Sequence, residues 1–246
     1  MADPLNVVID LSHYNEVSSF SDIRASGIVG VIHKATQGLA DRDPTYLVRR
    51  ERAVAAGLWW GAYHFGTNAD GAAQARFFLS VVNPGPQDLL ALDFEQNGDD
   101  TMTLAQAEQF VTEVFNQTGR YPGFYSDSLA GSLLGGSVNE TLRQCWLWRA
   151  EYGAALSVPP TWPTWTMWQY TDGEHGEGPH VVPGIGGPCT CDRSRFNGDI
   201  DGLARLWGHT ANTATPEAQV GPRLTLRASR NRSTAKPVDA VHQPSQ

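Results

Sequence analysis

Cysteine, basic residues and long apolar runs are all scarce in this sequence of 246 residues. The three cysteines are Cys145, Cys189 and Cys191, and an odd number is not typical of a disulfide framework. No run of about 18 or more apolar residues occurs, so no membrane-spanning helix is predicted. Lys and Arg total 18 against 26 Asp and Glu, for a formal net charge of -8. This excess of acid argues against broad nucleic-acid binding.

Several local signals are missing as well. The opening Met-Ala-Asp-Pro-Leu-Asn has no basic region and no long apolar region, so no secretory signal is predicted. Neither a Gly-x-Ser-x-Gly elbow nor a phosphate-binding Gly-rich loop is present, so acyl-transfer and nucleotide chemistry lack their usual signatures. Of the catalytic chemistries considered, catalysis by carboxylates remains.

The composition changes near the end of the chain. After Trp207 the apolar periodicity stops, and residues 210–246 are rich in Thr, Ser, Pro, Ala and Arg. Such a segment buries too little apolar surface to offset the entropy of ordering it. We therefore predict one domain over residues 1–208, followed by a disordered, mildly basic tail over residues 209–246.

Apolar runs of strand length alternate with helical stretches in the first part of the chain. The eight predicted strands span residues 7–12, 30–36, 59–65, 89–95, 122–126, 145–152, 164–171 and 189–196. Predicted helices span residues 44–56, 70–82 and 103–118, and Thr103 with Gln106 fits a capping box. The alternation favours an α/β fold with a parallel sheet or barrel. The later connections are rich in Gly, Pro and Trp, which predicts few helices in the second half.

Two acids follow the apolar run Leu-Leu-Ala-Leu, as Asp93 and Glu95. Residues two apart on a strand face the same side, with Cα atoms about 7 Å apart. Ionising both acids in a partly desolvated site is unfavourable, so one tends to keep its proton while the other stays charged. Acid-catalysed cleavage of a glycosidic bond needs this division of roles.

A third acid, Asp10, follows Val-Val-Ile at the end of the first predicted strand. Asp10 and Asp93 could each simply cap a strand end by binding loop amides. Beside Glu95 on one barrel rim, however, they favour a catalytic site, because active sites of such barrels lie at the carboxyl ends of the strands.

Aromatic residues gather at the same predicted strand ends. A ring of flat side chains around a polar floor suits an oligosaccharide, because sugar rings present apolar C–H faces. The alternative is that most of these residues belong to the core. His64 has the same two readings, either a hydrogen-bonded structural residue or a functional one. The aromatic residues concerned are Tyr63, Phe65, Tyr125, Tyr152, Trp165, Trp168 and Tyr170.

A second constellation contains soft metal ligands. His175, His180, Cys189 and Cys191 lie in a Gly/Pro-rich stretch, but their spacing matches no common zinc pattern. We predict no metal and no cofactor, and keep a metal-stabilised interaction domain as an alternative.

Eight short motifs in order resemble the glycoside hydrolase family 25 lysozymes, the Chalaropsis-type muramidases. The resemblance extends from about Val7 to Trp207. The motifs are Ile9-Asp10-Leu-Ser12, Lys34-Ala-Thr36-x-Gly38, Ala56-Gly57-Leu58 leading into Gly61-Ala-Tyr63-His64-Phe65, Leu92-Asp93-x-Glu95, Tyr125-Ser126, Leu147-Trp148-x-Ala150-x-Tyr152, Trp168-Gln169-Tyr170 and Asp192-x-x-x-Phe196.

The resemblance implies an irregular, flattened (β/α) barrel of eight strands with few helices in its second half. It implies hydrolysis of the β-1,4 bond between N-acetylmuramic acid and N-acetylglucosamine in bacterial peptidoglycan, by a monomer without a cofactor. Glu95 would be the general acid, Asp93 its partner, and Asp10 and Asp192 would complete the acidic cluster. The residues expected to bind substrate are Lys34, Tyr63, His64, Tyr125, Tyr152, Trp168 and Gln169.

Some alternatives stay open beside this resemblance. Asp93 could stabilise the substrate's own N-acetyl group or activate water, which would give retention or inversion respectively. The barrel could also be a catalytically inactive peptidoglycan-binding module. Gln37 and Ser194 stand where the family often has Glu and Asn, and residues 175–188 form an unusual insertion. With no leader predicted, the enzyme would be made in the cytoplasm and reach the wall by holin-type lysis or a dedicated secretion system.

Overall fold

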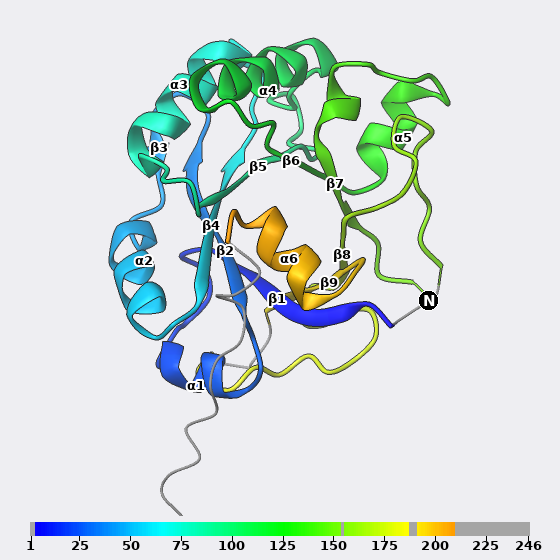
Figure 1. Ribbon diagram of the computed structural model, residues 1–246. Helices are drawn as coiled ribbons and strands as arrows, with labels where there is room; N and C mark the ends of the chain where they lie inside the picture. The colour runs from blue at the N-terminus through cyan, green and yellow to red at the C-terminus, as the bar shows by residue number, and fades with distance from the viewer. Residues whose placement is uncertain (1–2, 154, 187–190, 210–246) are drawn as a thin grey trace, which may run out of the picture. The chain divides into compact units, whose positions relative to one another are not determined.

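The computed structural model describes residues 3–153, 155–186 and 191–209 (Figure 1). The predicted tail, apart from His209, lies outside the described residues, as does Cys189. The strands are β1 (Leu5–Leu11), β2 (Gly30–Gln37), β3 (Asp41–Arg42), β4 (Trp59–Phe65), β5 (Leu89–Asp93), β6 (Gly123–Ser126), β7 (Trp146–Ala150), β8 (Met167–Thr171) and β9 (Asp192–Phe196). The helices are α1 (Phe20–Ala25), α2 (Tyr46–Ala55), α3 (Gly71–Val82), α4 (Leu104–Thr118), α5 (Ser128–Leu134), the 3-10 helix η1 (Leu142–Gln144) and α6 (Ile200–Leu206).

Eight of the strands form a closed barrel. Their order is β1-β9-β8-β7-β6-β5-β4-β2, and β2 pairs with β1 to complete the ring, while the two-residue β3 pairs with β2 alone. The prediction of an irregular eight-stranded barrel is therefore confirmed. β9 runs antiparallel to both β1 and β8, whereas the other ring strands are parallel to their neighbours. Antiparallel strands can be joined without a crossover helix. The described part of the segment between β8 and β9 contains no helix.

The helices surround mainly the first half of the ring. Figure 1 shows α2, α3 and α4 outside the strands, and α3 packs along α4. These three helices match the three predicted ones, and the capping box at Thr103 is present. In the described part of the second half the helices are the short α5, η1 and α6, which agrees with the prediction of few helices there. None of the helices in the described part of the chain is long and apolar enough to cross a membrane.

Helix α6 closes the end of the barrel at which β2 begins. Figure 1 shows α6 crossing the opening of the ring. Trp207, just after α6, contacts Gly30, the first residue of β2, and its Nε1 donates to the Trp60 carbonyl at 2.9 Å. A Cβ on residue 30 would meet the Trp207 ring at 2.8 Å, so this close approach requires glycine. The opposite end of the barrel stays available for a site.

The predicted boundaries need several corrections. The strand predicted over 89–95 ends at Asp93, and those predicted over 145–152, 164–171 and 189–196 begin at Trp146, Met167 and Asp192. β3 and the helices α1, α5 and α6 were not predicted. The three helices have six or seven residues, too few to show a periodic apolar stripe, and each begins with a side-chain cap.

Candidate active site

The carboxyl ends of the parallel strands bring the predicted acids to one pocket. Strand register places Asp10 beside Asp192, and Asp93 between Phe65 and Tyr125. Alternation along each strand turns the pocket residues into the barrel while their neighbours face the surrounding helices. The pocket is lined by Asp10, Tyr63, Asp93, Glu95, Tyr125, Trp148, Gln169 and Asp192.

Glu95 lies two residues beyond the end of β5 but still reaches this pocket. Phe94, between the two acids, is fully buried in the outer core, so the alternation continues past the strand. Asp93 is buried and Glu95 half-buried, and the two carboxyl groups are hydrogen-bonded to each other. Burial raises the pKa of both acids, and the closeness of Glu95 raises the pKa of Asp93 further. The pair therefore holds a shared proton into a higher pH range than an isolated carboxyl group would.

Asp10 and Asp192 form a second carboxyl pair across β1 and β9. Burial, followed by the nearby Asp192, raises the pKa of Asp10 well above its ordinary value. Burial also raises the pKa of Asp192, to about 6, although a hydrogen bond with Asp10 opposes the rise. Burial thus raises the pKa of all four acids above the ordinary carboxyl value.

Gln169 connects one acid pair to the tyrosines. Its Nε2 donates to both carboxylate oxygens of Asp10, each at 3.1 Å. Its Oε1 accepts from the Tyr125 hydroxyl at 2.9 Å and from the Tyr152 hydroxyl at 2.8 Å. Burial and the neighbouring acids raise the pKa of Tyr63 and Tyr125, so both keep their protons and can donate. The floor of the pocket is therefore a fixed network of donors and acceptors.

Lys34 supplies a positive charge beside the acids. Burial lowers its pKa, and Asp93 is the first of the nearby acids that oppose this. Its Nζ donates to Gln37 Oε1 at 2.7 Å and lies 4.9 Å from the centre of the Phe65 ring. A glutamine at position 37 can therefore hold the lysine through a neutral acceptor, without adding a further charge.

Of the residues expected to bind substrate, Tyr63, Tyr125 and Gln169 line the pocket, whereas His64 and Trp168 face away from it. His64 is fully buried on the outer side of β4, where it contacts Thr36 and Gln74 and stacks on Phe110. Burial lowers its pKa to about 4, so this histidine is neutral and structural. Trp168 lies on the face of β8 opposite Gln169, and its Nε1 donates to the Glu151 carbonyl. Both expectations are corrected, because each residue alternates with one that does face the pocket.

Trp148 lines the pocket, although it was not predicted as a site residue. Its Nε1 donates to Ser194 Oγ at 2.9 Å, and its ring meets Tyr125 edge-on at 4.9 Å. Ser194, fully buried, thus accepts from the indole and fixes it. The alternation of side chains along β7 could have indicated that Trp148 faces the barrel interior, because Trp148 and Ala150 share one face.

The soft-ligand residues are engaged in other contacts. His175 Nδ1 pairs with Asp172, His180 contacts the carbonyls of Gly173 and Gly176, and Cys191 is buried as a free thiol. Within residues 3–153, 155–186 and 191–209, no three His, Cys, Asp or Glu side chains gather as metal ligands would.

The sequence matches known proteins over most of its length. The family described as Glycosyl hydrolases family 25 matches residues 9–178. Lysozyme M1 from Streptomyces globisporus is 29% identical over 218 residues, covering 82% of this chain and 71% of that protein. N,O-diacetylmuramidase from Chalaropsis sp is 27% identical over 221 residues, covering 80% of this chain and 96% of that protein.

A solved structure supports the same relationship. The bacterial lysozyme from Streptomyces coelicolor superposes with a TM-score of 0.72 at 30% sequence identity, covering 86% of this chain and 100% of that one. The barrel fold is therefore shared over 86% of this chain.

Proposed function

The chain belongs to glycosyl hydrolase family 25 and is a glycoside hydrolase of the lysozyme type, and we propose that it cleaves the β-1,4 bond between N-acetylmuramic acid and N-acetylglucosamine in peptidoglycan. The observation that carries this proposal is the pocket with two carboxyl pairs and a set of phenol donors. Paired carboxyl groups of unequal protonation are what hydrolysis of a glycosidic bond requires.

Glu95 is proposed as the general acid. It is the less buried member of its pair, so a glycosidic oxygen at the mouth of the pocket could reach it. Its raised pKa, caused first by burial, keeps the proton needed to protonate the leaving group.

Asp93 is proposed to assist the N-acetyl group of the substrate. Its Oδ1 is buried and has no hydrogen-bond partner among the described residues, so it could accept an N–H from an acetamido group. Such a donor would favour the ionised form of Asp93. The shared proton would then pass to Glu95 through the hydrogen bond between the two acids.

The other pocket residues are proposed to bind and orient the sugar. Asp10 and Asp192 complete the acidic floor, and Gln169 holds Asp10 with both oxygens fixed. Tyr63, Tyr125, Tyr152 and Lys34 would provide hydrogen bonds to hydroxyl and acetamido groups.

Assistance by the N-acetyl group predicts retention of configuration at the anomeric carbon. The alternative, direct attack by water, predicts inversion. Following the first-formed anomer by NMR during hydrolysis of a soluble glycan distinguishes the two. An initial product with inverted configuration would rule out assistance and assign Asp93 the role of a base.

The test of the activity is the release of muramic-acid reducing ends from purified peptidoglycan. Glu95→Gln removes the proton donor, and we expect a rate loss of about 100- to 10,000-fold with wall binding retained. Glu140→Gln, at a side chain that is 76% exposed, is the matched control and should leave the rate unchanged. If the unmodified protein binds walls but releases no reducing ends, the inactive binding module is the correct reading.

We propose that the enzyme acts outside the cytoplasm, where its wall substrate lies, as a monomer. Release by holin-type lysis or by a dedicated secretion system is part of the proposal, as is the division into a catalytic domain over residues 1–208 and a mildly basic tail over residues 209–246. Detection of the protein in the medium before and after host-cell lysis distinguishes the two routes.

A further inference from the structure

Tyr14 stands out at the end of the barrel that carries the acids. It lies in the loop after β1, four residues beyond Asp10. Its side chain is 83% exposed, the largest value among the exposed large hydrophobic side chains of the described residues. One face of the ring contacts His13, with the ring centres 4.0 Å apart. A single exposed aromatic residue is ordinary on a protein surface. The contacts of the surrounding loop are therefore the evidence for a role of Tyr14.

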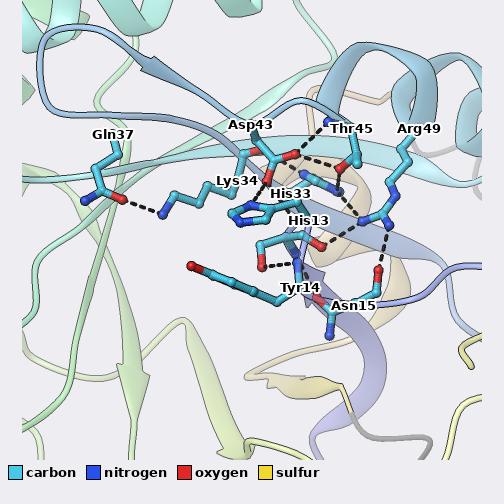
Figure 2. A network of polar contacts seen from close by, with 10 residues as sticks. His13, Tyr14, Asn15, His33, Lys34, Gln37, Asp43, Thr45 and Arg49 are labelled. Carbon is cyan, nitrogen blue, oxygen red and sulfur yellow. Dashed lines mark hydrogen bonds and ion pairs between the residues drawn. The ribbon is translucent and has the colours of Figure 1, made fainter. Parts of the chain in front are cut away.

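A buried arginine holds the backbone on both sides of Tyr14. Arg49, which is 9% exposed, donates to the Ser12 carbonyl at 2.7 Å and to the Asn15 carbonyl at 2.6 Å (Figure 2). The Asn15 side chain accepts from the Ser12 amide at 2.8 Å. The residues before and after the His13–Tyr14 pair are thus fixed to α2, although the tyrosine side chain itself faces solvent.

A buried carboxylate holds the neighbouring histidine in the same way. Asp43 Oδ2 accepts from the His13 amide at 2.8 Å and lies 3.0 Å from His13 Nδ1. Burial alone would raise the pKa of Asp43, but donors from Thr45 and His13 outweigh it and keep the pKa below its ordinary value. Asp43 therefore stays ionised, and its contact with His13 supports the ring against which Tyr14 rests.

The network continues to the strand that carries Lys34. His33 is fully buried, and burial lowers its pKa to about 4, so it is neutral. Its Nδ1 donates to the Lys34 carbonyl at 2.7 Å, which leaves Nε2 free to accept from Arg49 at 3.1 Å. Figure 2 shows the Tyr14 ring extending from this network on the same side as the Lys34 side chain. The backbone that carries the exposed ring is thus connected through Arg49 and His33 to the Lys34 carbonyl.

We propose that Tyr14 is a sugar-binding platform that stacks on a pyranose ring of the bound glycan strand, outside the sugar pair that is cut. This inference rests on the proposed function. A flat ring held by a rigid loop loses little entropy when a sugar stacks on it, and its apolar face matches the C–H face of a pyranose. Tyr152, 38% exposed after β7, lies across β8 and β9 from the β1 loop in the ring order. The acid-bearing end of the barrel therefore has exposed aromatic side chains in two separated loops.

The test compares glycan fragments of different length, freed from their stem peptides. For the longest fragments, we expect Tyr14→Ala to raise KM about 3- to 10-fold with kcat unchanged, which is the range of an aromatic stacking contact. For the shortest fragment that is cleaved, KM should not change, because the outer sugar is absent. Tyr14→Phe should behave like the unmodified protein on both. A purely structural role would not depend on fragment length.

The control is Phe115→Ala, which removes a 38% exposed ring near the end of α4, away from the strand ends that carry the acids. It should leave KM unchanged for every fragment. Equal KM values for Tyr14→Ala and the unmodified protein on long fragments would overturn the platform while leaving the proposed activity intact. If the unmodified protein cleaves nothing, sedimentation with purified peptidoglycan gives the answer instead. Binding that is equal for Tyr14→Ala and the unmodified protein then refutes the platform separately from the activity.

Discussion

Asp10, Asp93, Glu95 and Asp192 are four carboxyl groups that share one pocket. Burial raises the pKa of each, and in all four a neighbouring acid contributes. A carboxyl group with a raised pKa in the folded protein binds its proton more tightly there than in the unfolded chain. The folded state therefore loses stability as the pH rises from the ordinary carboxyl pKa through the raised one. The acids that serve catalysis weaken the fold at neutral pH.

Asp192 gives a direct test of this cost. Its pKa of about 6, against an ordinary value of 3.8, places the loss of stability between about pH 4 and pH 6. We expect Asp192→Asn to raise the free energy of unfolding at pH 7 by about 3 kcal/mol and to leave it unchanged near pH 3, where both forms are neutral. Urea denaturation at the two pH values measures the difference. Asp99→Asn, at an exposed loop position, should show no such pH-dependent gain.

Single residues also mark the limit of the sequence prediction. Asp10, Asp93 and Glu95 could be predicted because each lies at or just beyond the end of an apolar strand. Asp192, Tyr63 and Gln169 were assigned from the family motifs. His64 and Trp168 were assigned to the pocket from their motifs, although alternation with Tyr63 and Gln169 turns them to the opposite face. Trp148 was left out because an apolar strand with two tryptophans does not reveal which one meets the pocket. The shared proton between Asp93 and Glu95 depends on burial, which the sequence alone does not give.

At the scale of elements, α4 shows how local sequence stabilises the barrel. Its capping box satisfies amides at the first turn through Thr103 and Gln106, neither of which lines the pocket of the acids. Thr103→Ala removes the side-chain acceptor, and we expect a loss of about 1 kcal/mol in stability with kcat/KM unchanged. Thermal unfolding beside an activity assay checks both. Thr112→Ala, the same substitution at an exposed position within α4, should be neutral or slightly stabilising.

The elements also differ in how well sequence predicts them. α2, α3 and α4 have 10 to 15 residues and show apolar faces, so the 3.6-residue pattern located them within two residues. The direction of β9 could not be predicted, because strand patterns read the same in both directions. Its antiparallel pairing follows from tertiary packing between β1 and β8.

At the scale of the whole molecule, net charge should govern how the enzyme meets its substrate. The chain has a formal charge of -8, and a bacterial wall is also anionic, so the two repel each other at long range. Raising the salt concentration from about 0.01 M to about 0.15 M shortens the screening length from about 30 Å to about 8 Å. We expect kcat/KM on intact walls to rise over this range. Short uncharged glycan fragments should show little change, and a fall in kcat/KM on walls would contradict the argument.

The closure of the barrel has a consequence for protein synthesis. β1 pairs with β2 on one side and with β9 on the other, so the ring closes only after residues 192–196 are available. Asp192 is synthesised with that last strand, long after Asp10. A nascent chain therefore carries most of the acids long before it can enclose them. Hydrolytic activity can begin only after residues 192–196 have joined the ring.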